Sequence, residues 1–278
     1  MEEKNLLISS GIEFNAYKPT KSFYADSQDI LLNKEEYKNK IINQGFLVVK
    51  NVMDKEIIKN LRDQYYELFK EEYKKVSNEW YQIKEPKDSH GYGNHPVKNY
   101  IKSDDFLKFI NDPNLKKIAS ILLDSYKTAL SQRVLVRSFS RLSTFTTNAH
   151  RDKDYYVSSN PLEALTAWIP LGLVDKVRGQ LVYLEKSHNL QFVDKSNSLK
   201  KDRIISNNLS ELAKNKGSRW LIPEINPGDV IFHCLNIVHA SFDSKTLFPR
   251  LSCDLRFAST KDYLDPRWNS YWYGEDGL

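Results

Sequence analysis

The stretch Ala149-His150-Arg151-Asp152 places an imidazole and a carboxylate two positions apart. Alternate side chains of an extended strand share a face, so His150 and Asp152 are predicted to point the same way and Arg151 the opposite way. Two histidines and one carboxylate form a facial triad that holds Fe(II) and leaves positions open for a cosubstrate and O₂. A His-x-Asp pair arises easily by chance, so alone it predicts only a candidate metal site.

A second imidazole and an anion-binding group occur further along the chain. His239 ends a β-rich stretch, and Arg250 opens the next one, eleven residues later. If residues 230–239 and 250–257 pair as antiparallel strands, Arg250 lies beside the metal pocket. Its guanidinium would there match the distal carboxylate of 2-oxoglutarate bidentately, with the Ser241 hydroxyl as a further donor.

The elements that must position these groups differ between the two halves of the chain. The stretch after Asp54 carries apolar residues at helical spacing, with Asp54 as the N-cap. A second helical region covers residues 104–126 and is predicted to divide at Pro113. We therefore expect residues 1–127 to be mainly helical support.

After residue 128, short β-rich stretches alternate with turn signals such as Pro-Gly-Asp at 227–229. The predicted strands are Arg133–Phe139, Leu165–Leu171, Leu181–Leu184, Val230–His233 and Leu251–Ala258. The predicted fold is mainly β with a helical layer: a double-stranded β-helix (jelly roll, cupin-like) core over 128–260, within one domain 1–278. The polar segment 185–217 is long for a loop and is predicted to be a lid.

Several of these stretches, in this order, resemble one known family. They are HRD at 150–152, TAWIPL at 166–171, GQLVYLEKSH at 179–188, PGDVIFH at 227–233, and HAS…R from His239 to Arg250. Over roughly residues 128–258 the chain is similar to the phytanoyl-CoA dioxygenase (PhyH) family of Fe(II)/2-oxoglutarate oxygenases.

The resemblance implies a double-stranded β-helix with Fe(II), 2-oxoglutarate as cosubstrate, and O₂. The implied iron ligands are His150, Asp152 and His239. The implied cosubstrate-binding residues are Arg250, Ser241, Trp168 and Gln132. Halogenating relatives carry Gly or Ala where this chain has Asp152, so the carboxylate favours hydroxylation.

Other residues are assigned more ordinary roles. His233 could compete as a metal ligand, but no arginine follows it at the matching separation, so we interpret it as structural. His188 is expected to end a strand, and Asp154 lies one step beyond the triad spacing. His95 and Arg137 are candidate substrate contacts. A protein-kinase interpretation of HRD fails, because position 157 is Val where Asn is required.

Composition excludes several classes of protein. The net charge of +5 comes from lysines interleaved with glutamates, which is typical of solvated helix faces rather than a nucleic-acid surface. No apolar stretch is long enough to span a membrane, and the N-terminus does not resemble a signal peptide, which predicts a cytoplasmic protein. The two cysteines, Cys234 and Cys253, are predicted to be buried thiols.

The leading hypothesis is an oxygenase that hydroxylates an aliphatic carbon of a small molecule, with specialised-metabolite intermediates favoured. Desaturation, epimerisation or cyclisation would use the same site. Two alternatives are a non-catalytic β-helix protein that binds a metal or small ligand, and a zinc hydrolase with the same three ligands. The sequence does not specify the oligomeric state.

Overall fold

Two sheets form the centre of the computed structural model, which describes residues 3–85, 95–143, 146–155, 164–193, 195 and 203–260. The five-stranded sheet has the order β1-β2-β11-β10-β13. Its strands are β1 (Lys4–Ser9), β2 (Ile12–Tyr17), β10 (Leu181–Leu184), β11 (Trp220–Leu221) and β13 (His239–Ser241). The seven-stranded sheet has the order β3-β4-β12-β9-β14-β7, with β8 also paired to β14. Its strands are β3 (Tyr24–Asp26), β4 (Phe46–Lys50), β7 (Ala129–Leu130), β8 (Leu135–Phe139), β9 (Ala164–Pro170), β12 (Val230–Cys234) and β14 (Arg250–Ala258).

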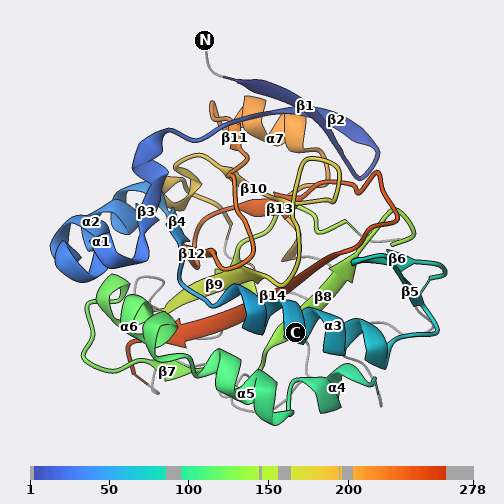
Figure 1. Ribbon diagram of the computed structural model, residues 1–278. Helices are drawn as coiled ribbons and strands as arrows, with labels where there is room; N and C mark the ends of the chain where they lie inside the picture. The colour runs from blue at the N-terminus through green and yellow to red at the C-terminus, as the bar shows by residue number, and fades with distance from the viewer. Residues whose placement is uncertain are drawn as a thin grey trace.

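Helices cover the outer side of the seven-stranded sheet, and the β1–β2 hairpin lies at the opposite end of the molecule (Figure 1). The helices in this layer are α3 (Lys55–Leu68), α4 (Val97–Tyr100), α5 (Asp104–Ile110) and α6 (Pro113–Leu122). Helices α1 (Ser27–Leu32) and α2 (Lys34–Gln44) lie beside β3 and β4, and a small hairpin, β5 (Tyr73–Val76) with β6 (Glu79–Gln82), follows α3. The double-stranded β-helix with a helical layer that the sequence predicts is therefore confirmed.

Strand β14 shows how one strand serves two environments. Leu251, Cys253, Leu255 and Phe257 belong to the main hydrophobic core, which also contains buried residues of α3, α5 and α6. The alternate positions, which share the opposite face, carry Arg250, Ser252, Asp254 and Arg256, and all four are buried. A strand with one apolar and one polar face, both buried, places polar groups in the interior of the protein.

The helical predictions for the first half are confirmed where local signals are strong. The Asp54 carboxylate caps α3 by accepting from the backbone N–H groups of Glu56 and Ile57. Pro113 begins α6 and separates it from α5. The sequence analysis did not anticipate strands β1 to β6 within residues 1–127. In β4 the first four residues are all buried, so no alternation of polar and apolar residues marks it as a strand.

The expected pairing of β12 with β14 is wrong. Strand β9 lies between them, with Thr166 opposite both His233 and Arg256. The segment that carries His239 belongs to the other sheet, where β13 pairs with β10. His239 and Arg250 therefore belong to different sheets rather than to adjacent strands.

The described part of segment 185–217 packs onto the core. Helix α7 (Leu209–Asn215) places Leu209 in a second hydrophobic cluster with Phe14 and Trp220. Ser206 forms a β-bridge with Ala149, next to the predicted metal ligand His150. Closure of this segment as a lid stays a prediction, and residues 194 and 196–202 lie outside the described residues.

Gly45 joins α2 to β4 in a conformation that few other residues adopt. Its φ is +81°, and a Cβ atom there would lie 2.5 Å from Nδ1 of His188 and 2.7 Å from Cδ1 of Ile237. His188 also contacts the Ile42 carbonyl at 3.1 Å, so it fastens the end of α2 as a structural residue.

We expect Gly45→Ala to lower the free energy of unfolding by about 2–4 kcal/mol, because left-handed strain and steric overlap add. Gly217→Ala is the matched control: its φ is +58°, but nothing lies within 4 Å of the added Cβ. There we expect a loss of only about 1–2 kcal/mol. Urea unfolding of both variants checks this, and equal losses would contradict the steric argument.

Both cysteines are buried free thiols, as predicted. Among the helices in the described ranges, none is long and apolar enough to cross a membrane.

Candidate metal centre

His150, Asp152 and His239 converge in the buried interior between the two sheets. One ligand atom from each lies within 4.8 Å of the others, and all three residues are buried. The two histidines are tied together through the backbone: each N–H donates to the carbonyl of the other, at 3.1 and 3.0 Å. Their rings lie 4.3 Å apart between centroids. The structure thus brings together the three residues that the sequence singled out.

Asp152 reaches this point by a different route from the one expected. His150 lies in an isolated β-bridge, but Asp152 begins a short 3₁₀ helix, Asp152–Tyr155. Arg151 turns away and holds the Asp154 carboxylate through two hydrogen bonds, at 3.0 and 2.7 Å. This buried ion pair stabilises the turn that presents Asp152, so Arg151 and Asp154 have a structural role.

Backbone carbonyls orient both imidazoles. Nδ1 of His150 lies 2.8 Å from the Asn148 carbonyl, and Nδ1 of His239 lies 3.2 Å from the Ile237 carbonyl. A carbonyl can only accept, so each Nδ1 carries the proton and each Nε2 presents its lone pair. The Nε2 atoms face Oδ1 of Asp152 at 3.9 and 3.8 Å. This is the tautomer that a metal ligand requires.

The charges suit a divalent cation. Burial lowers the pKa of His150, and burial together with the neighbouring His150 and His233 lowers the pKa of His239 well below its ordinary value. Burial by itself would raise the pKa of Asp152, but Arg256, His233 and His239 outweigh it and hold that pKa well below the usual range. Neutral imidazoles beside an ionised carboxylate are the protonation states in which these groups bind metal.

The lowered histidine pKa values predict how the metal-free protein responds to acid. Below the ordinary value of 6.5, the unfolded chain protonates these imidazoles while the folded chain does not, so acidification favours unfolding. We expect stability to fall from about pH 6.5 downwards, by at most about 1.4 kcal/mol per pH unit for each imidazole. Urea unfolding across this range checks it; a His150→Asn/His239→Asn variant should show a shallower slope, and an unchanged slope would contradict the assignment.

Arg250 is a buried cation without a carboxylate beside it among the described residues. It is 2% exposed, and its Nη1 donates to the Gly179 carbonyl, just before β10. The Nε atom has no hydrogen-bond partner among the described residues. Burial and the charge of Arg137 lower the pKa of Arg250 to about 9. The site therefore leaves a positive charge that a bound anion would neutralise.

The other residues predicted to contact the cosubstrate differ in how well their positions suit that role. Trp168 is buried in β9, and the Arg250 guanidinium lies 5.6 Å from its ring centroid and 4.6 Å from that of Phe139. The Ser241 hydroxyl accepts a hydrogen bond from the Thr147 N–H at 2.9 Å. Gln132 is exposed, while its neighbours in the chain are buried. The structure therefore gives no support for a cosubstrate contact by Gln132.

The two candidate substrate residues also differ. Arg137 lies on β8 opposite Ser252, and its Nη2 is 2.6 Å from the Asp254 carboxylate on the polar face of β14. Its side chain is 30% exposed and so is not sealed within the core. His95 is buried in the helical layer, with its ring 5.3 Å from that of Phe69 at the end of α3. The described contacts of His95 favour a packing role.

Three buried residues surround Asp152: Thr166, His233 and Arg256. Sequence reasoning interpreted His233 as a structural residue and gave Thr166 and Arg256 no role at this site. Thr166 donates to Oδ2 of Asp152, while His233 Nε2 and Arg256 Nη2 lie 3.4 and 3.5 Å from the same oxygen. A signal was present, since polar residues at alternate positions of the apolar strand β14 indicate a second, polar face. The register that joins the three residues came only from the structure.

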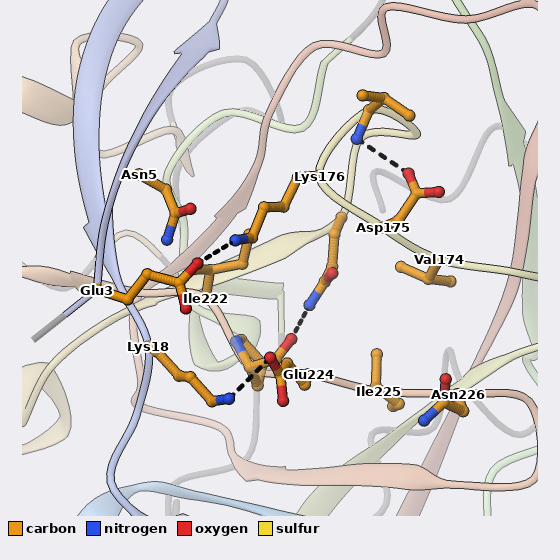
Figure 2. A pocket seen from close by; sticks show the side chains of 13 residues that line it. Glu3, Asn5, Lys18, Val174, Asp175, Lys176, Ile222, Glu224, Ile225 and Asn226 are labelled. Atoms are coloured by element: carbon orange, nitrogen blue, oxygen red, sulfur yellow. Dashed lines mark hydrogen bonds and ion pairs between the residues drawn. The ribbon is translucent and has the colours of Figure 1, made fainter.

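A hollow of about 560 Å³ lies elsewhere on the molecule and is lined in part by β1 and residues 174–177. Two ion pairs cross it, Lys18 with Glu224 at 2.8 Å and Lys176 with Glu3 at 2.5 Å (Figure 2). None of the three candidate metal ligands lines this hollow. Its charged groups are already paired, so it offers no comparable chemistry.

A double-stranded β-helix with a buried His-Asp-His cluster and a buried arginine is the architecture of non-haem iron oxygenases. The family comparison is more specific. The family model described as phytanoyl-CoA dioxygenase (PhyH) matches residues 42–252. The chain belongs to this family, as the sequence resemblance indicated. A comparison with curated proteins finds no significant match.

Solved structures of similar fold come from several enzymes. One is the non-haem α-ketoglutarate-dependent epimerase SnoN from nogalamycin biosynthesis, at 19% identity and a TM-score of 0.60, covering 82% of this chain and 84% of that one. The carbocyclase SnoK from the same biosynthesis has 17% identity and a TM-score of 0.58, covering 81% and 83%. EctD from S. alaskensis has 16% identity and a TM-score of 0.56, covering 96% and 88%. At these identities the likeness shows the fold.

Proposed function

We propose that this chain is an Fe(II)/2-oxoglutarate-dependent oxygenase that hydroxylates an aliphatic carbon of a small molecule and converts 2-oxoglutarate to succinate and CO₂. The observations that carry the proposal are a buried candidate cation site and a buried guanidinium that forms no ion pair with a described carboxylate. His150, Asp152 and His239 supply the first, and Arg250 supplies the second. A 2-oxo dicarboxylate bound to the metal needs both.

The residues of the metal site fit Fe(II). Two neutral imidazoles and one carboxylate form the facial set that leaves positions open for a cosubstrate and O₂. Bound Fe(II) supplies the redox chemistry that couples O₂ and 2-oxoglutarate to oxidation of the substrate. The chain itself contributes the tautomers of His150 and His239, the ionised Asp152, and a buried setting that excludes water.

Arg250 is proposed to bind the distal carboxylate of 2-oxoglutarate. Its unpartnered Nε and its lowered pKa both indicate a cation that lacks its anion in the protein alone. A carboxylate would accept hydrogen bonds from the planar guanidinium fork, with Trp168 as an aromatic wall beside it. Ser241, also buried, is proposed as a further donor to this carboxylate.

Arg137 is proposed to face the substrate. The Asp254 carboxylate holds one side of its guanidinium and leaves the partly exposed remainder available to an acceptor group. The described contacts give His95 no comparable position. The substrate class we propose, a specialised-metabolite intermediate, is supported by the similarity in fold to SnoN and SnoK, two enzymes of nogalamycin biosynthesis.

Other outcomes at the same centre are second candidates. SnoN is an epimerase and SnoK is a carbocyclase, so epimerisation or cyclisation stands beside hydroxylation. A binding protein without turnover, or a zinc hydrolase, would not need an arginine that binds the distal carboxylate of 2-oxoglutarate, as we propose for Arg250. That residue is the reason for preferring the oxygenase.

The proposal is tested by succinate formation from 2-oxoglutarate with Fe(II), in air and under argon, against a panel of small aliphatic and polycyclic substrates. We expect succinate only in air, with an oxidised product for an accepted substrate, and none from His150→Ala. Product structure distinguishes hydroxylation from epimerisation or cyclisation. Turnover with Zn(II) under argon would establish a hydrolase, and absence of succinate across the panel would favour a binding protein.

A further inference from the structure

The two oxygens of Asp152 occupy different surroundings. Oδ1 faces Nε2 of His150 and of His239, at 3.9 and 3.8 Å, and so belongs to the candidate metal site. Oδ2 points the other way, accepts a hydrogen bond from the Thr166 hydroxyl, and lies 3.4 Å from Nε2 of His233. One oxygen of the carboxylate thus faces the candidate metal site, and the other faces residues of the seven-stranded sheet.

The groups around Oδ2 come from a single row across three adjacent strands. Thr166 on β9 is directly opposite His233 on β12 and Arg256 on β14. Directly opposite residues on one face of an antiparallel pair have Cβ atoms about 4.5–5.5 Å apart, so a row of three can surround one oxygen atom. All three are buried, at 1%, 1% and 4% exposure, and Arg256 Nη2 lies 3.5 Å from Oδ2.

His233 is itself oriented from the opposite sheet. Its Nδ1 lies 3.2 Å from the Tyr183 hydroxyl on β10, and the Tyr183 ring stacks on Phe46 at 4.3 Å between centroids. Nε2 of His233 makes no hydrogen bond with any described residue, although it is buried and faces Oδ2. An ionised carboxylate oxygen can only accept, so we assign the proton of the neutral ring to Nε2, facing Oδ2, and Nδ1 then accepts from the Tyr183 hydroxyl. This assignment removes His233 from the set of metal ligands.

We propose that the row of Thr166, His233 and Arg256, which we name the carboxylate clamp, holds Asp152 as a ligand through Oδ1 alone. The inference rests on the proposed function, because it assumes that Oδ1 meets a metal. A carboxylate free to rotate would bind through both oxygens and occupy a position that the 2-oxo acid needs. The clamp withholds Oδ2 and so keeps that position available. Its members are positioning residues that act through Asp152.

The test uses Co(II) as an oxygen-insensitive probe, with calorimetry in place of an activity assay. We expect Thr166→Val, which keeps the shape of the side chain and removes the hydroxyl, to weaken Co(II) binding by about 10- to 100-fold. His233→Phe should weaken it to a similar degree. Thr166→Ser restores the hydroxyl and should remain within about threefold of the parent protein. His188→Gln is the matched control, a histidine outside the candidate metal site, and should leave Co(II) affinity unchanged.

A second measurement separates positioning from general loss of structure. With the metal site saturated, Thr166→Val should still bind 2-oxoglutarate about tenfold more weakly than the parent, because Oδ2 then competes for a coordination position. If either clamp variant fails to fold by circular dichroism, Tyr183→Phe removes one hydroxyl only and should weaken Co(II) binding by a few-fold.

Parent-like Co(II) and 2-oxoglutarate affinities in folded Thr166→Val and His233→Phe would overturn the clamp and leave the proposed function standing. A parent protein that binds no Co(II) would instead overturn the metal site on which both rest.

Discussion

Replacing His239 with alanine is expected to abolish productive metal binding, with an affinity loss on the order of 10³-fold or more and no detectable succinate formation. The imidazole is one of the three proposed ligands. Among the described residues the cluster has no fourth member that could take its place. The nearby His233 is not a substitute, because its Nε2 faces the far oxygen of Asp152.

Calorimetric titration of His239→Ala with Fe(II) under argon measures this loss, and circular dichroism checks the fold. His239 also exchanges two backbone hydrogen bonds with His150, and alanine preserves both, so the sheet should close as before. The His188→Gln control should bind Fe(II) like the parent, because His188 contacts α2 rather than the candidate metal site. If His239→Ala binds Fe(II) with an affinity within tenfold of that of the parent, His239 is not a ligand and the metal binds elsewhere.

Replacing Arg250 with methionine is expected to raise the 2-oxoglutarate concentration needed for half-maximal rate by about 10²- to 10³-fold. Removing one partner of a buried ion pair costs about 3–5 kcal/mol, and each 1.4 kcal/mol corresponds to a factor of ten. The metal ligands do not include Arg250, so Fe(II) affinity should stay close to that of the parent. Arg250→Lys keeps the charge but loses the planar fork. Its 2-oxoglutarate concentration for half-maximal rate should lie between those of the parent and of Arg250→Met.

Initial rates at varied 2-oxoglutarate, together with binding of 2-oxoglutarate to the metal-loaded protein, measure this effect. The exposed Arg141 provides the control, and Arg141→Lys should leave both constants unchanged. If Arg250→Met instead binds 2-oxoglutarate normally but fails to bind substrate, Arg250 is a substrate residue and the cosubstrate carboxylate lies elsewhere. Arg137, the nearest alternative cation, would then be the residue to replace.

Local chemistry explains which elements were predictable. The Asp54 carboxylate caps α3 from the position that its sequence predicts, and Pro113 starts α6 because it lacks the N–H that a helix interior requires. Strand β10 begins and ends as predicted, at Leu181 and Leu184. Strand β4 was missed, since a short apolar stretch without alternation fits a buried strand and a buried helix equally well.

Residue type and spacing were enough to single out the three proposed metal ligands, but partly for the wrong reason. His150 and Asp152 were expected to share the face of a strand, whereas Asp152 is presented by a 3₁₀ turn that Arg151 and Asp154 stabilise. Arg250 was expected beside His239 on a neighbouring strand, and it belongs instead to the other sheet. The chemistry requires only that these groups converge, and more than one backbone path achieves this.

The sequence by itself determined the kinds of group available: two imidazoles, a carboxylate and a guanidinium, carried on short β-rich stretches behind a helical layer. Only the tertiary structure decided which oxygen of Asp152 faces the two imidazoles of the candidate metal site and which accepts from Thr166 beside His233. The physical reason is strand register. The residues that surround one atom come from strands far apart in the chain, and their alignment depends on how whole sheets pair rather than on any local pattern.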